Sequence, residues 1–156
     1  MDREIIVITG DRGAGKSRYC LRLLSEKRED RSAAGIISPA VYTNGSKTGF
    51  YTLDVRTNEK KLCGIRTVSE GTIGHWQMDP AVLEWGNELI RSACPCDLLF
   101  IDELGPLEFE RREGYTAAFD VLRNGQYGAA YVVIRPECLE MFRQFFRDFR
   151  IIRIGE

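Results

Sequence analysis

The sequence predicts an α/β fold in which a mostly parallel β-sheet is covered by helices on both faces. Short, continuous apolar runs at residues 5–9, 98–101 and 130–134 are typical of strands that are buried on both sides. Segments with apolar residues at helical spacing separate these runs, as in repeated strand–helix units. The length of 156 residues suits one domain, and we expect residues 1–156 to form it.

The segments between the apolar runs supply the expected helices and a β-hairpin. We expect helices from Lys16 to about Lys27, after Asp79-Pro80, around residues 115–122 and from Pro136 onward. Two strands are expected at 35–43 and 47–56, joined by a tight turn at 43–46, with a third near 61–66 and a last one at 150–154. The hairpin is predicted to be a local insertion.

Composition excludes several classes of protein. Lysine and arginine number 22 against 23 acidic residues, so the net charge of −1 argues against a surface built for nucleic acid. We expect no membrane span, because no apolar run approaches the ~20 residues that one needs. We also expect no signal peptide, since the apolar run at 5–8 is short and is better explained as a strand.

The cysteines favour a reducing compartment over a metal centre. Their number is odd, their spacing does not fit structural zinc, and the chain has one histidine. We therefore expect reduced, mostly buried thiols and a cytoplasmic protein. The five positions are Cys20, Cys63, Cys94, Cys96 and Cys138.

The strongest motif is Gly10-Asp11-Arg12-Gly13-Ala14-Gly15-Lys16-Ser17, which matches the phosphate-binding pattern G-x-x-x-x-G-K-[ST]. Its glycines let backbone N–H groups turn toward phosphate oxygens, and the N-terminus of the following helix adds positive potential. Lys16 would carry a positive charge to the β- and γ-phosphates, and the Ser17 hydroxyl would ligate Mg²⁺. A strand before the motif and a helix after it provide the required context, so we predict nucleotide binding.

The second motif is a pair of acids, Asp102 and Glu103, at the end of the apolar run 98–101. An acid at the end of a buried strand beside a phosphate loop can hold Mg²⁺ through water, which is the predicted role of Asp102. A carboxylate one position later can orient and deprotonate a water in line with the γ-phosphate, which is the predicted role of Glu103. This pair favours hydrolysis, since a phosphotransferase whose acceptor is a hydroxyl needs no water-activating acid.

Three segments together resemble a small nucleoside-triphosphatase family that includes thermophile enzymes and a human cancer-related NTPase. Residues 101–108, Ile-Asp-Glu-Leu-Gly-Pro-Leu-Glu, look like its D-E-[IL]-G-x-[ML]-E signature. Residues 35–39 with 47–50 resemble its hairpin, and residues 73–79 resemble the segment before its second helix. The resemblance implies a P-loop NTPase with a RecA-like sheet and slow, Mg²⁺-dependent hydrolysis of several nucleoside triphosphates. It assigns that chemistry to Lys16, Ser17, Asp102 and Glu103.

The sequence departs from the family pattern in two places. Arg12 and Ala14 occupy loop positions where the family usually has proline and valine, and an Asn-Arg pair usual near the family's C-terminus is not found. A cation is also needed for the charge that develops during hydrolysis. The candidates are Arg12, Arg111, Arg112 and Arg135, and we favour Arg135 because it follows a strand and strand ends line the ligand crevice of such sheets.

These observations predict a hydrolase that binds ATP, GTP and other nucleoside triphosphates, with Mg²⁺ as cofactor and neither a membrane nor a nucleic acid as partner. Glu103, Lys16 and Arg135 are the predicted catalytic residues, and Ser17 and Asp102 the predicted metal ligands. The residues expected around the nucleotide are Gly10, Asp11, Arg12, Gly13, Ala14, Gly15, Lys16, Ser17, Arg18, Leu99, Phe100, Ile101, Asp102, Glu103, Leu104, Gly105 and Pro106. Two alternatives stay open: phosphoryl transfer to a small acceptor, and a nucleotide-dependent binding module with negligible turnover.

Overall fold

The fold was analysed in a computed structural model, which describes residues 3–69, 71 and 74–155. Its helices are α1 (Lys16–Lys27), α2 (Pro80–Arg91), α3 (Pro106–Glu110), α4 (Ala117–Asn124) and α5 (Leu139–Phe145), with 3₁₀ turns at Arg28–Asp30 and Pro136–Cys138. Its strands are β1 (Glu4–Thr9), β2 (Ala33–Ile37), β3 (Ala40–Thr43), β4 (Ser46–Asp54), β5 (Lys60–Arg66), β6 (Trp76–Met78), β7 (Cys96–Leu104), β8 (Tyr127–Ile134) and β9 (Arg150–Arg153). Within the described ranges, no helix is both long and apolar enough to cross a membrane.

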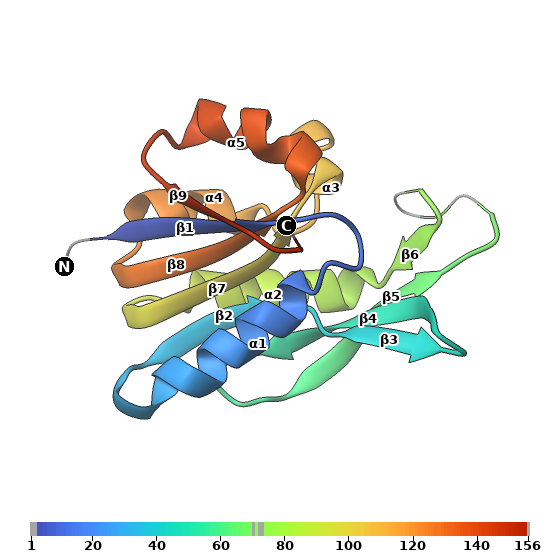
Figure 1. Cartoon of the computed structure of the whole chain (residues 1–156), viewed down its shortest axis with the longest axis horizontal. Helices are drawn as coiled ribbons and strands as arrows, with labels where there is room; N and C mark the ends of the chain where they lie inside the picture. The colour runs from blue at the N-terminus through green and yellow to red at the C-terminus, as the bar shows by residue number, and fades with distance from the viewer. Residues whose placement is uncertain (1–2, 70, 72–73, 156) are drawn as a thin grey trace.

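All the strands of the described residues join one sheet, which has a parallel half and an antiparallel half (Figure 1). The parallel half runs β2-β7-β8-β1-β9. Beyond β2 the order continues through β4, β5 and β6 in antiparallel pairs, and β3 pairs with β4. The predicted parallel sheet is confirmed. The inserted hairpin extends this sheet, because β4 is hydrogen-bonded directly to β2.

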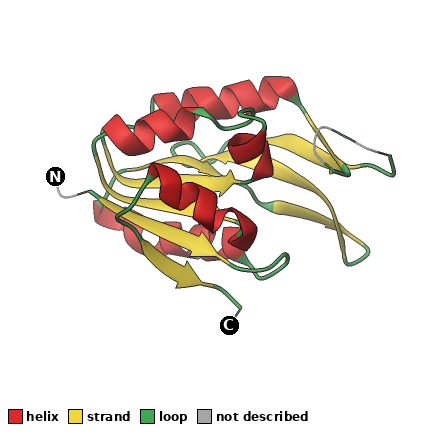
Figure 2. Ribbon diagram, turned by 90° about the horizontal axis from the view of Figure 1, so that it is seen from above, coloured by secondary structure: helices red, strands yellow, loops and turns green. Residues whose placement is uncertain are grey.

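Helices cover both faces of the sheet, as Figure 2 shows. On one face, α1 packs against the sheet through Cys20, Leu23 and Leu24. On the other face, buried residues of α2, α4 and α5 form a larger apolar cluster with the alternate residues of β1, β7 and β8. Strands β1, β7 and β8 are therefore apolar along both faces, as their sequence predicted.

One local prediction was wrong, and the short helix α3 was missed. Residues 35–43 do not form one strand, because β2 ends at Ile37 and β3 begins at Ala40. Pro39 stands at the break and has no N–H to donate to a strand partner, so the hydrogen bonding of β2 to its neighbours ends before it. The short helix α3 was not predicted, since five residues are too few for helical periodicity to be recognised.

The strand order brings three chain segments to one edge of the sheet. β8 lies between β1 and β7, and the three strands are parallel. Their carboxyl ends lead into the Gly10–Ser17 loop from β1, into Asp102 and Glu103 on β7, and into Arg135 after β8. Such an edge is where α/β sheets place their ligands.

Candidate active site

The loop from Gly10 to Ser17 joins β1 to α1 and turns sharply. Gly13 and Gly15 have φ angles of 77° and 96°, in the left-handed region that favours glycine. The amide of Ala14 donates to the carbonyl of Asp11 at 3.0 Å, which closes the turn. Helix α1 begins directly after Gly15, so its first free N–H groups belong to this loop and are available to an anion.

Lys16 is folded back over its own loop. Its Nζ donates to the carbonyl oxygens of Gly10 at 2.5 Å and Asp11 at 3.1 Å. The ammonium is thereby held at the mouth of the loop by weak neutral acceptors. A phosphate, which carries a full negative charge, is a stronger acceptor and would replace these carbonyls.

Asp102 connects the end of β7 to the Gly10–Ser17 loop. The Ser17 hydroxyl donates to Asp102 Oδ2 at 2.6 Å, and the backbone N–H of Ser38 donates to the same oxygen at 3.0 Å. The side chain is buried, and this desolvation, together with the charge of Glu103, raises the pKa of Asp102 to about 6. The bonds from Ser17 and Ser38 and the charge of Lys47 lower the same pKa. Burial and the charge of Glu103 outweigh them, so a bound cation would stabilise the ionised form of Asp102.

Glu103 is paired with Arg135. The guanidinium of Arg135 approaches Glu103 Oε1 with Nε at 3.3 Å and a terminal nitrogen at 3.2 Å. One-third of the Glu103 side chain and one-quarter of the Arg135 side chain are exposed. Both contacts involve Oε1, so the ion pair fixes the carboxylate while it stays open to solvent on one side.

Comparison with known proteins identifies the family of this chain. A family model described as NTPase matches residues 5–154. The chain belongs to this NTPase family. The nucleoside-triphosphatase THEP1 of Methanosarcina barkeri is 27% identical over 155 residues, covering 97% of this chain and 88% of the relative. That of Methanothermobacter thermautotrophicus is 33% identical over 120 residues, covering 75% of this chain and 69% of the relative.

Solved structures agree on the fold. A human cancer-related nucleoside triphosphatase, solved in solution, superposes with a TM-score of 0.71 at 18% identity, covering 98% of this chain and 89% of that one. The THEP1 crystal structure from Aquifex aeolicus gives a TM-score of 0.58 at 19% identity, covering 96% and 88%. The α/β fold of this chain is therefore shared with both structures.

The oxygen atoms at this NTPase site fit Mg²⁺. A hydroxyl and a carboxylate, Ser17 Oγ and Asp102 Oδ2, lie 2.6 Å apart, and both are hard oxygen ligands of the kind that Mg²⁺ prefers. Two protein oxygens are few for an octahedral ion, which in phosphate-loop sites takes its other ligands from phosphate and water.

The other residues that were predicted to surround the nucleotide differ in how deeply they are buried. Leu99, Phe100 and Ile101 are fully buried, and their side chains belong to the apolar clusters on the two faces of the sheet. Leu104 is also buried. Gly105 and Pro106 open α3, while the exposed Arg12 and Arg18 lie at the rim of the loop.

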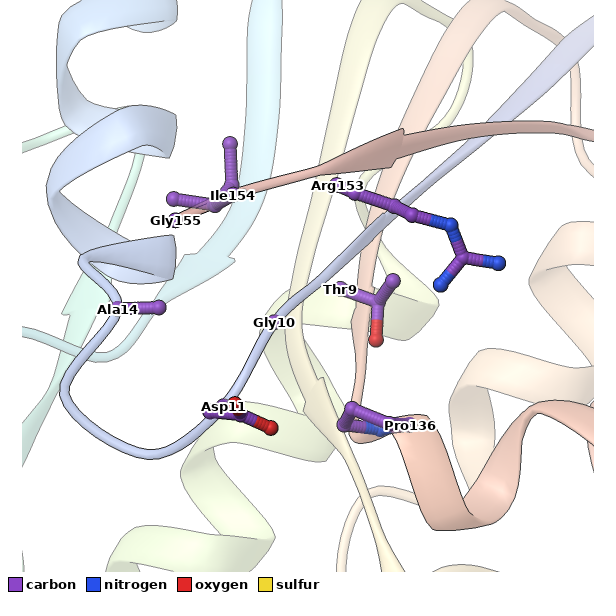
Figure 3. Close-up of a pocket in the computed structure, with 8 residues that line it drawn as sticks. All are labelled: Thr9, Gly10, Asp11, Ala14, Pro136, Arg153, Ile154 and Gly155. Carbon is purple, nitrogen blue, oxygen red and sulfur yellow. The ribbon is translucent and has the colours of Figure 1, made fainter.

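A small cavity of about 140 Å³ flanks the loop on the β9 side (Figure 3). Its lining includes Thr9, Asp11, Pro136 and Arg153. The volume is well below the ~300 Å³ at which ligand pockets begin, so it is suited to a few waters and not to a nucleoside. Thr9 Oγ1 is buried and has no hydrogen-bond partner among the described residues.

Sequence reasoning missed two residues at this site. Ser38 donates its backbone N–H to Asp102, and the charge of Lys47 lowers the pKa of Asp102. The sequence signal for Ser38 was Pro39, which follows it and marks the end of β2. Lys47 was visible only as part of the Lys-Thr-Gly-Phe segment of the hairpin.

Proposed function

We propose that this chain hydrolyses nucleoside 5′-triphosphates to the diphosphate and inorganic phosphate in a Mg²⁺-dependent reaction. The relatives named nucleoside-triphosphatase support this proposal, and so does membership of the NTPase family. Backbone amides of the loop hold phosphates without reading the base, so we propose that ATP, GTP and other nucleoside triphosphates are all substrates.

The bond between Ser17 and Asp102 is the observation that carries the proposal. It joins the first turn of the phosphate-loop helix to the end of β7, with 2.6 Å between the two oxygens. The next residue, Glu103, presents a partly exposed carboxylate, and this position supports its proposed role beside the γ-phosphate. A site made only for binding has no need of a second acid at that place.

Each residue has a separate role in the proposed reaction. The loop amides and Lys16 bind the phosphates, and Ser17 and Asp102 hold the metal, which offsets phosphate charge when it is bound. Arg135 fixes Oε1 of Glu103, so the other carboxylate oxygen accepts a proton from the attacking water. Arg135 was predicted to stabilise the developing charge directly, and in the proposed reaction it also positions Glu103.

Phosphate release from ATP, GTP and CTP with Mg²⁺, measured for the wild type and Glu103→Gln, tests the function. We expect turnover with all three nucleotides and a loss of at least about 100-fold in kcat in the variant, the usual scale for a general base. Nucleotide affinity should stay within about threefold, because Glu103→Gln keeps the shape of the side chain.

The matched control is Glu113→Gln, an exposed acid ten positions further along the chain. It should hydrolyse all three nucleotides at the wild-type rate. A wild type that binds nucleotide and releases no phosphate would contradict the proposed hydrolysis. Release that depends on an added hydroxyl acceptor would indicate phosphoryl transfer instead.

A further inference from the structure

Glu108 is a buried acid that the proposed reaction does not use. It lies on α3 and is 6% exposed. Its Oε1 accepts the backbone N–H of Gly105 at 2.8 Å, and its Oε2 accepts that of Tyr115 at 2.9 Å. The backbone N–H of Glu108 in turn donates to the carbonyl oxygen of Gly105 at 3.1 Å. A carboxylate is costly to bury without hydrogen bonds, so the two amides offset part of that cost.

The loop between α3 and α4 is shaped to fit around this carboxylate. Gly114 has a φ angle of 75°, and a Cβ placed on it would lie 2.1 Å from Glu108 Oε2. The backbone approaches this closely because Gly114 has no side chain. The buried Asn87 holds the same loop from another side, since its Nδ2 donates to the carbonyl of Gly114 at 2.8 Å and its Oδ1 accepts the N–H of Ala117 at 3.1 Å. Of these two buried side chains, Glu108 is the one bonded to Gly105.

Gly105 lies beside the side chain of Arg135. Leu104 and Ile134 pair at the carboxyl ends of β7 and β8, and Gly105 and Arg135 are the residues that follow them. A Cβ placed on Gly105 would lie 3.8 Å from Nε of Arg135 and 4.0 Å from its Cδ. The Arg135 side chain therefore runs alongside the Gly105 backbone, and the same Nε donates to Glu103 Oε1 at 3.3 Å.

We propose that Glu108 is a positioning residue for hydrolysis, which fixes the Gly105 backbone and, through it, the orientation of the pair between Arg135 and Glu103. This inference rests on the proposed function, in which Arg135 holds one oxygen of Glu103 so that the other accepts the proton of water. Glu108 transfers no proton in the reaction. A displacement of about 1 Å at a reacting group can cost about 100-fold in rate, so a residue that acts through its neighbours can still have a large effect on kcat.

The test compares Glu108→Ala and Glu108→Gln with a matched control, Asn87→Ala. The alanine variant removes both acceptors, whereas the glutamine variant keeps one acceptor oxygen in a side chain of the same shape. Asn87→Ala removes two buried hydrogen bonds from the same loop and leaves the bond to Gly105 in place. Each Glu108 variant is also combined with Arg135→Ala.

The measurements are kcat and KM for ATP with Mg²⁺, and urea unfolding of every variant. They are made at pH 8, because burial raises the pKa of Glu108 to about 7 and the carboxylate must be ionised to accept both bonds.

We expect Glu108→Ala to lower kcat by at least about tenfold, with Glu108→Gln between it and the wild type. KM should stay within about threefold in both, because Lys16 and the loop amides are unchanged. Asn87→Ala should lose a comparable amount of stability and keep its kcat within about threefold of the wild type. In the Arg135→Ala background, either Glu108 substitution should lower kcat by less than about twofold further, because the pair through which Glu108 acts is already absent.

Three results would overturn this inference. One is a folded Glu108→Ala variant that keeps the wild-type kcat. Another is an equal fall of kcat in Asn87→Ala and Glu108→Ala at equal loss of stability, which would limit Glu108 to the folding of the loop. The third is a Glu108 effect of the same size with and without Arg135, which would exclude this route to Glu103.

The test does not depend on one variant. If Glu108→Ala does not fold, Glu108→Gln with and without Arg135→Ala makes the same comparison, and a kcat equal to the wild type in Glu108→Gln would overturn the inference. A wild type without turnover would instead refute the hydrolase function itself, so the two failures are distinguishable.

Discussion

Ser17 and Asp102, 85 positions apart in the sequence, share a hydrogen bond of 2.6 Å from Oγ to Oδ2. The bond crosses from the first turn of α1 to the end of β7, two strands away from β1. One bond thus links the Gly10–Ser17 loop to the segment that bears the two acids. The amide of Ser38 on the same carboxylate oxygen attaches the start of the antiparallel half to this link.

Ser17→Ala should lower both stability and metal-dependent affinity. Asp102 is buried, and loss of one of its donors leaves a carboxylate with less compensation, at a cost of about 1–3 kcal/mol in the free energy of unfolding. The Mg²⁺-dependent part of nucleotide affinity should be lost as well. Urea unfolding at pH 7 and nucleotide titrations with and without Mg²⁺ measure the two effects.

Two further variants separate the hydroxyl from its position. Ser17→Thr keeps a hydroxyl and should retain both properties, while Ser25→Ala, on an exposed part of the same helix, should change neither. An equal loss of affinity with and without Mg²⁺ in Ser17→Ala would argue against a metal ligand at this position.

Lys16→Met should weaken nucleotide binding with little effect on folding. The bonds from Lys16 to two loop carbonyls join groups that water can also satisfy, so their removal should change the free energy of unfolding by less than about 1 kcal/mol. A charge-assisted bond to phosphate is worth about 1.5–3 kcal/mol, which corresponds to a loss of about 10- to 100-fold in affinity. Calorimetric titration with ATP is the measurement, with Lys27→Met at the other end of α1 as the control. Unchanged affinity in Lys16→Met would remove Lys16 from the phosphate site.

The parts of the site that could be predicted are those that depend on consecutive residues of the sequence. An apolar strand followed by a glycine-rich loop and a helix is a local pattern, and so is an apolar strand that ends in two acids. Their meeting was inferred from the pattern of strands, and the bond from Ser17 to Asp102 bears it out. Ser38 and Lys47 could not be found this way, because their approach depends on β4 pairing with β2 and on β2 pairing with β7.

Side-chain partnerships and helix faces were harder to predict than strands. Arg135 was expected at the edge of the sheet, but its pairing with Glu103 depends on the local backbone at the carboxyl ends of β7 and β8. The helix expected from Pro136 onward buries its phenylalanines to different extents. Phe142 is fully buried, whereas Phe145 is 42% exposed because α5 ends there, at the rim of the larger apolar cluster.

Gly35→Ala should destabilise the fold by at least about 2 kcal/mol. Gly35 has a φ angle of 103°, and a Cβ placed on it would lie 2.1 Å from the carbonyl oxygen of Phe100 on β7. The substitution combines a backbone penalty of about 1–2 kcal/mol with a clash against a central strand. Gly45→Ala isolates the first term, since Gly45 has a φ angle of 81° and open space around it. Urea unfolding of the two variants should therefore differ, and equal losses would show that the approach to Phe100 does not limit this position.

Glu108 should make stability depend on pH. Its buried carboxylate accepts bonds from the amides of Gly105 at 2.8 Å and Tyr115 at 2.9 Å. Desolvation outweighs these bonds and raises the pKa of Glu108 to about 7 in the folded protein, above the ~4.3 of an unfolded chain. The folded state therefore binds this proton more tightly. The stabilisation is fully present below about pH 4.3 and is lost as the pH rises through about 7.

Glu108→Gln removes this titration, so the wild type should lose stability relative to Glu108→Gln between pH 5 and pH 8. The expected change in the difference of unfolding free energies is about 1–3 kcal/mol. Urea unfolding at pH 5, 6, 7 and 8 measures it. Glu110→Gln, an exposed residue on the same short helix, should give a curve parallel to the wild type over this range. A parallel curve for Glu108→Gln as well would mean that Glu108 is ionised across the range, with its two amide bonds outweighing its burial.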